Sequence, residues 1–372
     1  MRLVYLHYAS LPSRAANTVH VMKMCHAFAQ NGNNVTLISL RDKDRLHSKY
    51  PLYDFYGVGK SFNVIRVPKP SKKYRKKAIS LMSLAARLMI PDVFYSRDIF
   101  GCYRAASLGL NVIYESHQPP ESLGPKTLDR FLKLSEHPRF RRLIVISEVL
   151  KQLYLDLAPR LADRIVVAHD AADLPSCKLT GPAAIEKRAA LTIGYVGHLY
   201  EGRGIDIIAA LAERCRWADF HIVGGMPEGI DHWRTKLADL ENVTMHGFVP
   251  PAKVSAYLRC FDVVLAPYQR RVFVEGGAET SRWMSPMKIF EYMAHAKPII
   301  CSDLPVLREV LEHGRNSLLC DPDDLNAWMA ALEQLHSDPA LRDRLGRAAE
   351  AQVMREHTWV KRASSVLEGL NI

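Results

Sequence analysis

The chain has 372 residues, more than a single hydrophobic core usually organises, so two domains are expected. Hydrophobic residues make up 48% and charged residues 24% of the sequence, the balance of a soluble globular protein with little room for disorder. The formal charge of +11 favours an anionic partner, which could be a nucleic acid, a phospholipid surface or a phosphorylated small molecule.

The N-terminus and the cysteines bear on the compartment. Residues 1–8 form an apolar strand pattern and lack the features of a signal peptide. The most apolar stretch, residues 78–94, is interrupted by two charges and a proline, so it falls short of the roughly 18 apolar residues of a membrane span. The seven cysteines are odd in number and contain no C-x-x-C pair. We therefore expect a cytoplasmic protein with reduced thiols.

The N-terminal half alternates short β-rich apolar runs with helical patterns, which predicts a parallel sheet with helices on both faces. A helix is expected between the first two runs, with Asn17 or Thr18 as N-cap and Gly32 as a left-handed stop. The predicted strands are Leu3–Leu6, Val35–Ser39, Val64–Val67, Val93–Tyr95, Val112–Glu115, Leu143–Ile146 and Ile165–Ala168.

A segment rich in Pro, Gly, Ala and Lys, residues 174–190, is the predicted linker. The alternation then restarts, so the sequence predicts an α/β protein with a first domain over 1–173 and a second over 191–354. The strands predicted for the second domain are Leu191–Val196, Phe220–Val223, Val243–His246, Val263–Ala266, Pro298–Cys301 and Ser317–Leu319.

Two strand-to-helix turns of the second domain could bind an anion. The turn Gly197–Gly204 contains His198 and Arg203, and its glycines would let backbone N–H groups approach a phosphate. A structural glycine turn is the alternative. The second turn, Ser285-Pro286-Met287-Lys288, leads into a helix in which Lys288 and Glu291 share a face. A diphosphate and a ribose diol could bind there, or Glu291 could simply pair with Lys288 and complement the helix dipole.

Two features lie in the first domain. His117 follows a predicted strand at the carboxyl edge, where Glu115, Ser116 and His117 could bond sugar hydroxyls, or His117 could serve packing alone. The basic segment Lys69–Lys77 precedes an apolar-rich stretch that includes Ile79, Met82, Leu84 and Leu88. It is either an anionic membrane surface contact or a solvated loop before an ordinary core helix.

Several chemistries lack their signatures. H-E-x-x-H and C-x-x-C are absent, so no metal site and no cofactor are expected. G-x-S-x-G, the Walker loop and a G-x-G-x-x-G after the first strand are also absent, which argues against hydrolase, kinase and dehydrogenase functions. Without a helix-turn-helix or an aromatic-interleaved basic patch, nucleic-acid binding is not expected.

The stretch Ser285–Ile300 resembles the donor-site motif of retaining family 4 (group 1) glycosyltransferases of the GT-B fold, two Rossmann-like doubly wound domains facing across a cleft. The resemblance extends through Asn242–Tyr268, Tyr195–Arg203, Tyr114–His117 and Thr358–Ala363. It implies metal-independent transfer of a sugar from a nucleotide sugar to a glycan, lipid-linked or small-molecule acceptor, with the last helix, from about residue 355, returning to the first domain.

By this resemblance, Arg203 and Lys288 contact the donor diphosphate and His117 a sugar hydroxyl near the reacting carbon. The implied donor-binding residues are Gly197, His198, Ser285, Pro286, Met287 and Glu291, and the implied acceptor-side residues are Asn17 and Thr18. The sequence departs from the family pattern at Trp283, where many members have a glutamate, and at His198, where many have an arginine. These departures favour the alternative of a catalytically weak sugar-nucleotide-binding or scaffold protein. The donor base and sugar are left open, and so is a peripheral attachment to the inner membrane face.

Overall fold

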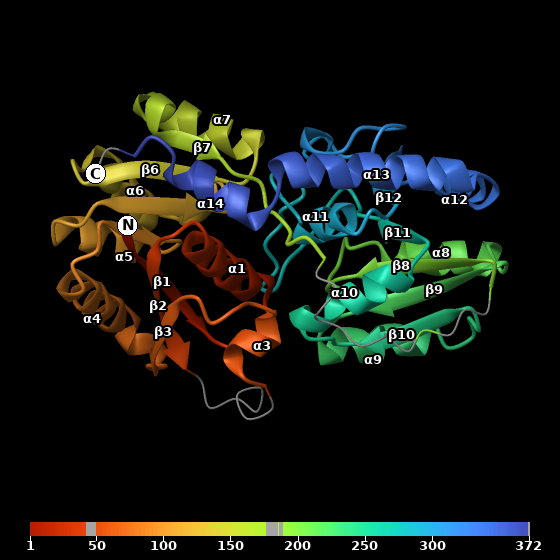
Figure 1. The fold of residues 1–372 in the computed structure, drawn as a ribbon, viewed down its shortest axis with the longest axis horizontal. Helices are drawn as coiled ribbons and strands as arrows, with labels where there is room; N and C mark the ends of the chain where they lie inside the picture. Colours follow the sequence, from red (N-terminus) through yellow and green to blue (C-terminus); the bar gives the residue numbers. More distant parts are fainter. Residues whose placement is uncertain (42–49, 176–184, 186–188, 371–372) are drawn as a thin grey trace. The chain divides into compact units, whose positions relative to one another are not determined.

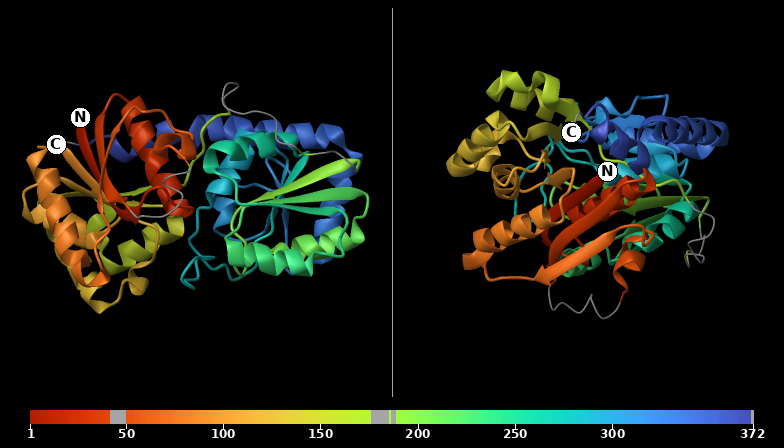
Figure 2. Two further views of the ribbon diagram at one scale, coloured as in Figure 1. Left: turned by 90° about the horizontal axis from the view of Figure 1, so that it is seen from below. Right: turned by 60° about the vertical axis from the view of Figure 1, so that its left-hand side comes forward.

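The computed structural model describes residues 1–41, 50–175, 185 and 189–370, which form two compact units. Unit 1 comprises residues 1–169 and 359–372, so both termini belong to it, and unit 2 comprises residues 170–358. Most of the predicted linker, residues 176–184 and 186–188, lies outside the described part of the chain. Each unit is an α/β sandwich in which a parallel sheet lies between layers of helices (Figures 1 and 2).

Unit 1 has a seven-stranded sheet in the order β3-β2-β1-β4-β5-β6-β7. Its strands are β1 Arg2–Ser10, β2 Asn34–Arg41, β3 Asn63–Pro68, β4 Val93–Ser96, β5 Val112–Ser116, β6 Phe140–Val145 and β7 Ile165–Val167. Its helices are α1 Ala16–Gln30, α3 Leu52–Tyr56, α4 Arg75–Leu88, α5 Ile99–Ser107, α6 Pro125–Glu136, α7 Glu148–Leu157 and α14 Trp359–Leu367.

Unit 2 has a six-stranded sheet in the order β10-β9-β8-β11-β12-β13. Its strands are β8 Leu191–Val196, β9 Ala218–Val223, β10 Val243–Gly247, β11 Val263–Ala266, β12 Ile299–Ser302 and β13 Leu318–Cys320. Its helices are α8 Ile205–Arg214, α9 Pro227–Lys236, α10 Pro251–Cys260, α11 Met287–Ala294, α12 Leu325–Ser337 and α13 Pro339–Glu356. The doubly wound α/β class predicted from the sequence is confirmed in both units, and every predicted strand is present with ends shifted by a few residues.

The strands of unit 2 are apolar along their whole length because the sheet is covered on both faces. In β11, Val263 and Leu265 belong to the core on one side of the sheet, and Val264 and Ala266 to the core on the other. Successive side chains of a strand point to opposite faces, so an uninterrupted apolar run fills both cores. The same principle explains why these short runs could be recognised in the sequence.

Both sheets reverse their winding direction at one place, between β1 and β4 in unit 1 and between β8 and β11 in unit 2. Open parallel sheets bind ligands beyond the carboxyl ends of the strands at such a switch point. The chain segments that follow these four strands are therefore the places to look for functional residues.

The predicted N-cap of the first helix is wrong. Helix α1 begins at Ala16 with Ala15 as N-cap, and no side chain caps it. The Thr18 hydroxyl bonds back to the carbonyl oxygen of Ala15 at 2.7 Å, and Asn17 lies exposed in the first turn. The predicted stop is present, since Gly32 has a φ of +78° directly after the C-cap Asn31.

Helix α14 is the C-terminal element of unit 1 and packs against α1. The Asn31 side chain donates to the carbonyl oxygen of Val360 and to the hydroxyl of Ser364, each at 2.9 Å. From β6, Arg142 donates to the carbonyl oxygens of Val366 and Glu368 at 2.8 Å. These bonds tie the end of the chain to the unit in which it begins.

Candidate functional sites

The turn after β8 packs closely against the segment after β11, at the switch point of unit 2. A Cβ atom on Gly204 would lie 1.6 Å from the carbonyl oxygen of Pro267, and one on Gly202 would lie 1.9 Å from that of Arg271. Both glycines have a φ of +79°. Any side chain here would clash with backbone and strain the turn, so these two glycines are structurally required. At Gly197 a Cβ would instead lie 2.9 Å from Nζ of Lys288.

Lys288 is the central charged residue of this region. It lies in the first turn of α11 and is only 8% exposed, and its Nζ atom has no hydrogen-bond partner in the described part of the chain. The ammonium group lies 3.8 Å from the ring centre of Tyr195 and 5.0 Å from that of Tyr268. Burial lowers the pKa of Lys288 well below its ordinary value, and the charge of Arg203 lowers it further. The aromatic faces compensate the ammonium only in part.

Arg203 adds a second cation beside Lys288. Its guanidinium carbon lies 5.6 Å from the ring centre of Tyr268, and its Nε atom is buried with no partner among the described residues. The hydroxyl of Tyr195 donates to the carbonyl oxygen of His198 at 2.6 Å, which fixes the Tyr195 ring over the ammonium. Two neighbouring cations with buried donors left over form a site that would hold a polyanion.

The start of α11 is anchored to the ends of two strands by Tyr292. The backbone N–H of Val196 donates to the Tyr292 hydroxyl at 2.8 Å, and that hydroxyl lies 3.3 Å from the carbonyl oxygen of Leu265, to which it donates. No side chain caps α11 at Pro286, and of its first N–H groups that of Ile289 donates to the carbonyl oxygen of Pro286 at 3.0 Å. Lys288 therefore sits in a fixed place relative to the turn after β8.

The remaining predicted donor residues lie around this centre. Ser285 is buried, and its hydroxyl accepts from the backbone N–H of Asp170 at 2.8 Å. The His198 ring stacks on Tyr200 with 4.9 Å between ring centres. Pro286, Met287 and Glu291 are partly exposed. The alternative in which Glu291 pairs with Lys288 finds no hydrogen bond in the structure, because Nζ has no partner among the described residues, although the charge of Glu291 acts to raise the pKa of Lys288.

Glu279, one of the acids near the departure at Trp283, is already bonded within its own loop. Trp283 lies partly buried in the loop before α11. Glu279, on the same loop, accepts from Arg271 at 3.1 Å and from the Ser281 hydroxyl at 3.0 Å. Its carboxylate is therefore already engaged with side chains of its own loop.

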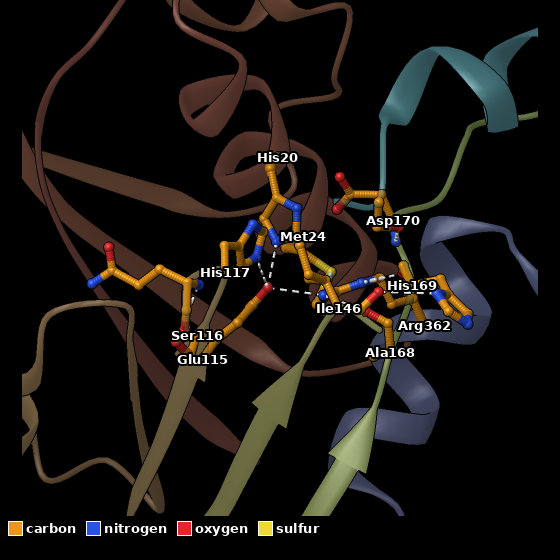
Figure 3. A network of polar contacts seen from close by, with 12 residues as sticks. His20, Met24, Glu115, Ser116, His117, Ile146, Ala168, His169, Asp170 and Arg362 are labelled. Carbon is orange, nitrogen blue, oxygen red and sulfur yellow. Dashed lines mark hydrogen bonds and ion pairs between the residues drawn. The ribbon is translucent and has the colours of Figure 1, made fainter. Parts of the chain in front are cut away.

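Unit 1 contains a buried carboxylate surrounded by polar side chains, among them His20, His117 and Arg362 (Figure 3). Glu115, at the end of β5, has a fully buried side chain and accepts from His117 Nε2 at 2.7 Å and from Arg362 Nη2 at 2.8 Å. His20 Nε2 lies 2.9 Å from the same oxygen, and the Tyr95 hydroxyl donates to the other. Burial alone would raise the pKa of Glu115, but Arg362 and the two histidines outweigh it and hold the pKa well below its ordinary value.

Arg362 links helix α14 to the sheet (Figure 3). It also donates from Nε to the carbonyl oxygen of His169 at 2.8 Å and from Nη2 to that of Ala168 at 3.0 Å. The charge of Glu115 is thus matched, with its hydrogen bonds satisfied, by a residue 247 positions away in the sequence. Such an arrangement holds a buried carboxylate ionised.

His117 is oriented by this carboxylate. Burial and the nearby Arg97 lower the pKa of His117 to about 4, although Glu115 acts to raise it, so the ring is neutral at pH 7. A neutral imidazole that donates from Nε2 carries its acceptor on Nδ1. Its side chain is 18% exposed, which leaves the ring accessible to a ligand.

The prediction that Glu115 and Ser116 join His117 in bonding sugar hydroxyls is wrong for those two residues. Both are 1% exposed. The Ser116 hydroxyl lies 2.8 Å from that of Tyr154 and donates to the carbonyl oxygen of Gln118. Thr18 is likewise engaged, since its hydroxyl accepts from Tyr56 at 3.0 Å besides bonding to Ala15. Of the residues predicted in unit 1, His117 and the exposed Asn17 keep side-chain groups open to a ligand.

Sequence reasoning missed the residues that support the site. Tyr195 lies within the apolar run of β8, and Tyr268 comes two residues after the apolar run of β11. Neither position marks these tyrosines in the sequence as neighbours of Lys288. The contact of His20 and Arg362 with Glu115 joins three distant segments. A basic residue in an otherwise apolar C-terminal helix face was the one available signal, because a buried arginine requires an acidic partner.

A metal ion has one candidate location in the described part of the chain. The ligand atoms of His20, Glu115 and His117 lie within 4.8 Å of one another. Arg362 already matches the charge of Glu115, and both imidazoles bind the same carboxylate oxygen. A divalent cation would have to displace these bonds beside a guanidinium, so the residues fit it poorly. The expectation of a metal-free protein stays a prediction.

Two doubly wound units in one chain are the architecture of the GT-B class of glycosyltransferases. Residues 18–174 match the family described as Glycosyltransferase Family 4, and residues 190–338 match the family described as Glycosyl transferases group 1. The chain therefore carries a family 4 domain followed by a group 1 glycosyltransferase domain.

Relatives support the same classification. An uncharacterized glycosyltransferase of Haemophilus influenzae is 22% identical over 94% of both chains. A D-inositol 3-phosphate glycosyltransferase of Pseudarthrobacter chlorophenolicus is 28% identical, but the match spans 36% of the chain and only 30% of that relative.

Solved structures share the fold across the whole chain. Anabaena HepE in complex with UDP-glucose matches with a TM-score of 0.72 at 14% identity, covering 99% of this chain and 98% of HepE. WaaG, a glycosyltransferase involved in lipopolysaccharide biosynthesis, matches with a TM-score of 0.66 at 13% identity, covering 99% of this chain and 100% of WaaG.

The buried ion pair of unit 1 makes a stability prediction. Arg362→Met leaves the Glu115 carboxylate buried without its cation, which should lower the free energy of unfolding by about 3–5 kcal/mol in urea titrations. In the double variant Glu115→Gln with Arg362→Met, the free energy of unfolding should fall by less than the sum of the decreases in the two single variants. The control is Arg347→Met, which removes an exposed pair with Asp343 and should cost less than about 1 kcal/mol. Equal losses for Arg362→Met and Arg347→Met would contradict the account.

Proposed function

We propose that the protein transfers a sugar from a nucleoside-diphosphate sugar to an acceptor, with retention of anomeric configuration and without a metal ion. The observation that carries the proposal is Lys288, a buried lysine with no hydrogen-bond acceptor in the described residues and with Arg203 beside it. A diphosphate would supply the missing acceptors and charge. HepE, which shares the fold, has been solved with UDP-glucose, which supports a donor of this class.

In this mechanism the cations of unit 2 stabilise the leaving group. As the bond between the sugar carbon and the phosphate oxygen breaks, negative charge grows on the departing nucleoside diphosphate. Lys288, Arg203 and the uncapped first turn of α11 are already oriented toward an anion and need no reorganisation. They would supply the electrostatic stabilisation that a divalent ion supplies in other transferases.

The partly exposed Glu291, one turn along α11, would accept hydroxyls of the donor ribose. In unit 1, His117 would accept a hydrogen bond from a sugar hydroxyl through Nδ1, because Glu115 holds its Nε2 proton. Glu115 is buried in its network, and Glu279 is bonded to Arg271 and Ser281. Neither suits a covalent glycosyl-enzyme, so attack from the leaving group's own face, with the acceptor proton passing to the departing phosphate, is the route to retention.

A second candidate is a catalytically weak protein that binds a sugar nucleotide as a scaffold. Trp283 and His198 favour it, because Glu279 does not replace the missing acid. The two candidates share the donor site and differ in turnover.

Donor binding is the first test. A panel of nucleoside diphosphates and nucleotide sugars, with EDTA present, should raise the melting temperature selectively for one base. At a ligand concentration 100 times Kd, the stabilisation should be about 2.7 kcal/mol. Arg203→Gln and Glu291→Gln should abolish the shift, since they remove the diphosphate and ribose contacts. The control is Arg270→Gln, which changes an arginine of the same unit that bonds Asp321 and Asp323 on the surface. This variant should still show the rise in melting temperature on ligand binding.

Turnover follows with the donor so identified. Lys288→Met should lower kcat by about 10²–10³ with folding retained, and NMR of the product should show the donor's anomeric configuration. A donor that binds but is neither transferred nor hydrolysed over a broad acceptor panel would favour the scaffold. No shift from any nucleotide would contradict both candidates.

We further propose that unit 1 docks on an anionic membrane surface through one face of α4. No helix in the described ranges is long and apolar enough to cross a bilayer. The two faces of α4 differ: Ile79 and Met82, which the sequence grouped with the basic segment, are buried in the unit. The exposed large apolar side chains of α4 are Leu81, Leu84 and Leu88, with exposures of 66%, 46% and 76%. Tyr74 just before the helix and Ile90 just after it are 48% and 58% exposed.

This exposed face lies next to the basic residues. Tyr74, Leu81 and Leu88 are seven positions apart, which is two helical turns, so they lie on one side of the helix. Lysines 69, 72, 73, 76 and 77 precede or begin the helix, and no acidic residue occurs between positions 69 and 90. An apolar stripe flanked by cations suits the headgroup region of an anionic bilayer and favours a lipid-linked acceptor.

Vesicle binding tests this face. The protein should co-sediment with vesicles containing phosphatidylglycerol, and binding should weaken as salt increases. The double variant Leu81→Ser with Leu88→Ser should bind about tenfold more weakly or worse, because each leucine loses apolar burial. Met354→Ser is the matched control, as Met354 is 47% exposed on α13. Absence of wild-type binding at low salt would overturn the docking proposal.

A further inference from the structure

The switch point of unit 1 contains two buried donors that the proposed reaction has not used. His7 is 7% exposed, and its Nε2 atom is buried with no hydrogen-bond partner in the described part of the chain. Nη1 of Arg97 is likewise a buried atom without a hydrogen-bond partner among the described residues. Buried polar groups in native proteins are almost always paired, and an unpaired cationic donor is costly. Two such groups on neighbouring strands require an explanation.

The strand register brings these two residues together. Leu6 of β1 pairs with Ser96, the last residue of β4, so His7 on β1 and Arg97 just after β4 are the next residues along the two segments. Ser96 also pairs with Tyr114 of β5, which leads into Glu115 and His117. The carboxyl ends of three adjacent strands thus present His7, Arg97 and His117 at one edge of the sheet. This edge is where parallel sheets bind ligands.

The charges around this edge are unbalanced. The groups that face it are Tyr5 and His7 from β1, His20 from α1, Arg97 after β4, Glu115 and His117 from β5, and Arg362 from α14. Glu115 is the one carboxylate among them, and Arg362 matches it. The charge of Arg97 is therefore left over. It acts, after burial, to lower the pKa of His7 to about 3 and that of His117 to about 4.

We infer that His7, Arg97 and His117 form a subsite for an oxyanion, a phosphate or a carboxylate, carried by the acceptor. Arg97 would bind it through its planar fork, and His7 would donate from Nε2 as a neutral imidazole. The oxyanion would hold the acceptor on unit 1, next to the ring that contacts the sugar. That the oxyanion belongs to the acceptor rests on the proposed transfer function. The binding of an oxyanion to these three residues does not depend on that function.

Histidine NMR of the full chain tests the subsite, with inorganic phosphate and acetate as probes. A bound oxyanion should raise the pKa values of His7 and His117, because it offsets the charge of Arg97. Arg97→Gln should weaken this binding by about tenfold to a hundredfold and should raise both pKa values without any probe. Arg97→Lys keeps the charge and should keep the low pKa values while binding less tightly.

Two controls separate this subsite from the donor site. Arg203→Gln should remove phosphate binding in unit 2 and leave the histidine response unchanged. Arg97→Gln should still bind the nucleotide that stabilises the wild type, which shows that unit 2 is intact.

A response to phosphate indicates a phosphorylated acceptor, and a response to acetate alone indicates a carboxylate; either supports the subsite. Histidines that respond to neither probe would overturn it. Displacement of phosphate from the histidines by a nucleoside diphosphate would also overturn it, since the subsite would then belong to the donor. Failure of nucleotide binding with a normal histidine response would instead contradict the proposed function alone.

Discussion

Lys288 is a buried lysine for which the described part of the chain offers no hydrogen-bond acceptor. The Tyr195 and Tyr268 rings lie against its ammonium group, Arg203 repels it, and Gly197 leaves room for it at the switch point of the sheet. A lysine in such a place is destabilised in its charged form until an anion arrives. Much of unit 2 maintains this arrangement: the glycines that let the turn approach, the tyrosine that anchors α11, and the hydroxyl that fixes the Tyr195 ring.

Unit 1 also buries a charged side chain, but here the charge is paired within the protein. Its buried carboxylate, Glu115, is fully matched by Arg362 and two histidines, so it serves as a rigid support for His117. The support depends on α14, the last helix of the chain, so truncation of the C-terminus would disturb the neighbourhood of His117. Among the described residues of this unit, Nη1 of Arg97 is buried without a hydrogen-bond partner. Each unit therefore has a satisfied framework and, at its switch point, cationic donors that remain open to an anion.

The sequence predicted the fold well because parallel strands buried on both faces read as short apolar runs, as β8 and β11 show. It also placed Lys288 and Glu291 correctly in the first turns of α11, since spacing along a helix is local information. It could not show that Arg362 binds Glu115, or that Tyr268 flanks Lys288, because these contacts join distant segments. The cap of α1 was predicted wrongly for the same reason, because tertiary packing buries Thr18 and overrides the local pattern. The sequence also could not show which face of α4 is buried, since that too depends on packing.

The central claim is that a diphosphate supplies the acceptor that Lys288 lacks. The direct test is calorimetry of the selected nucleoside diphosphate over a series of pH values, without metal, in buffers of different ionisation enthalpy. The pKa of Lys288 is lowered in the free protein and should rise in the complex, so binding should take up a proton, and affinity should fall as pH rises between the two values. Lys288→Met should abolish the proton uptake and weaken binding, whereas Arg270→Gln should change neither. Binding with no proton uptake and unchanged affinity in Lys288→Met would contradict the account.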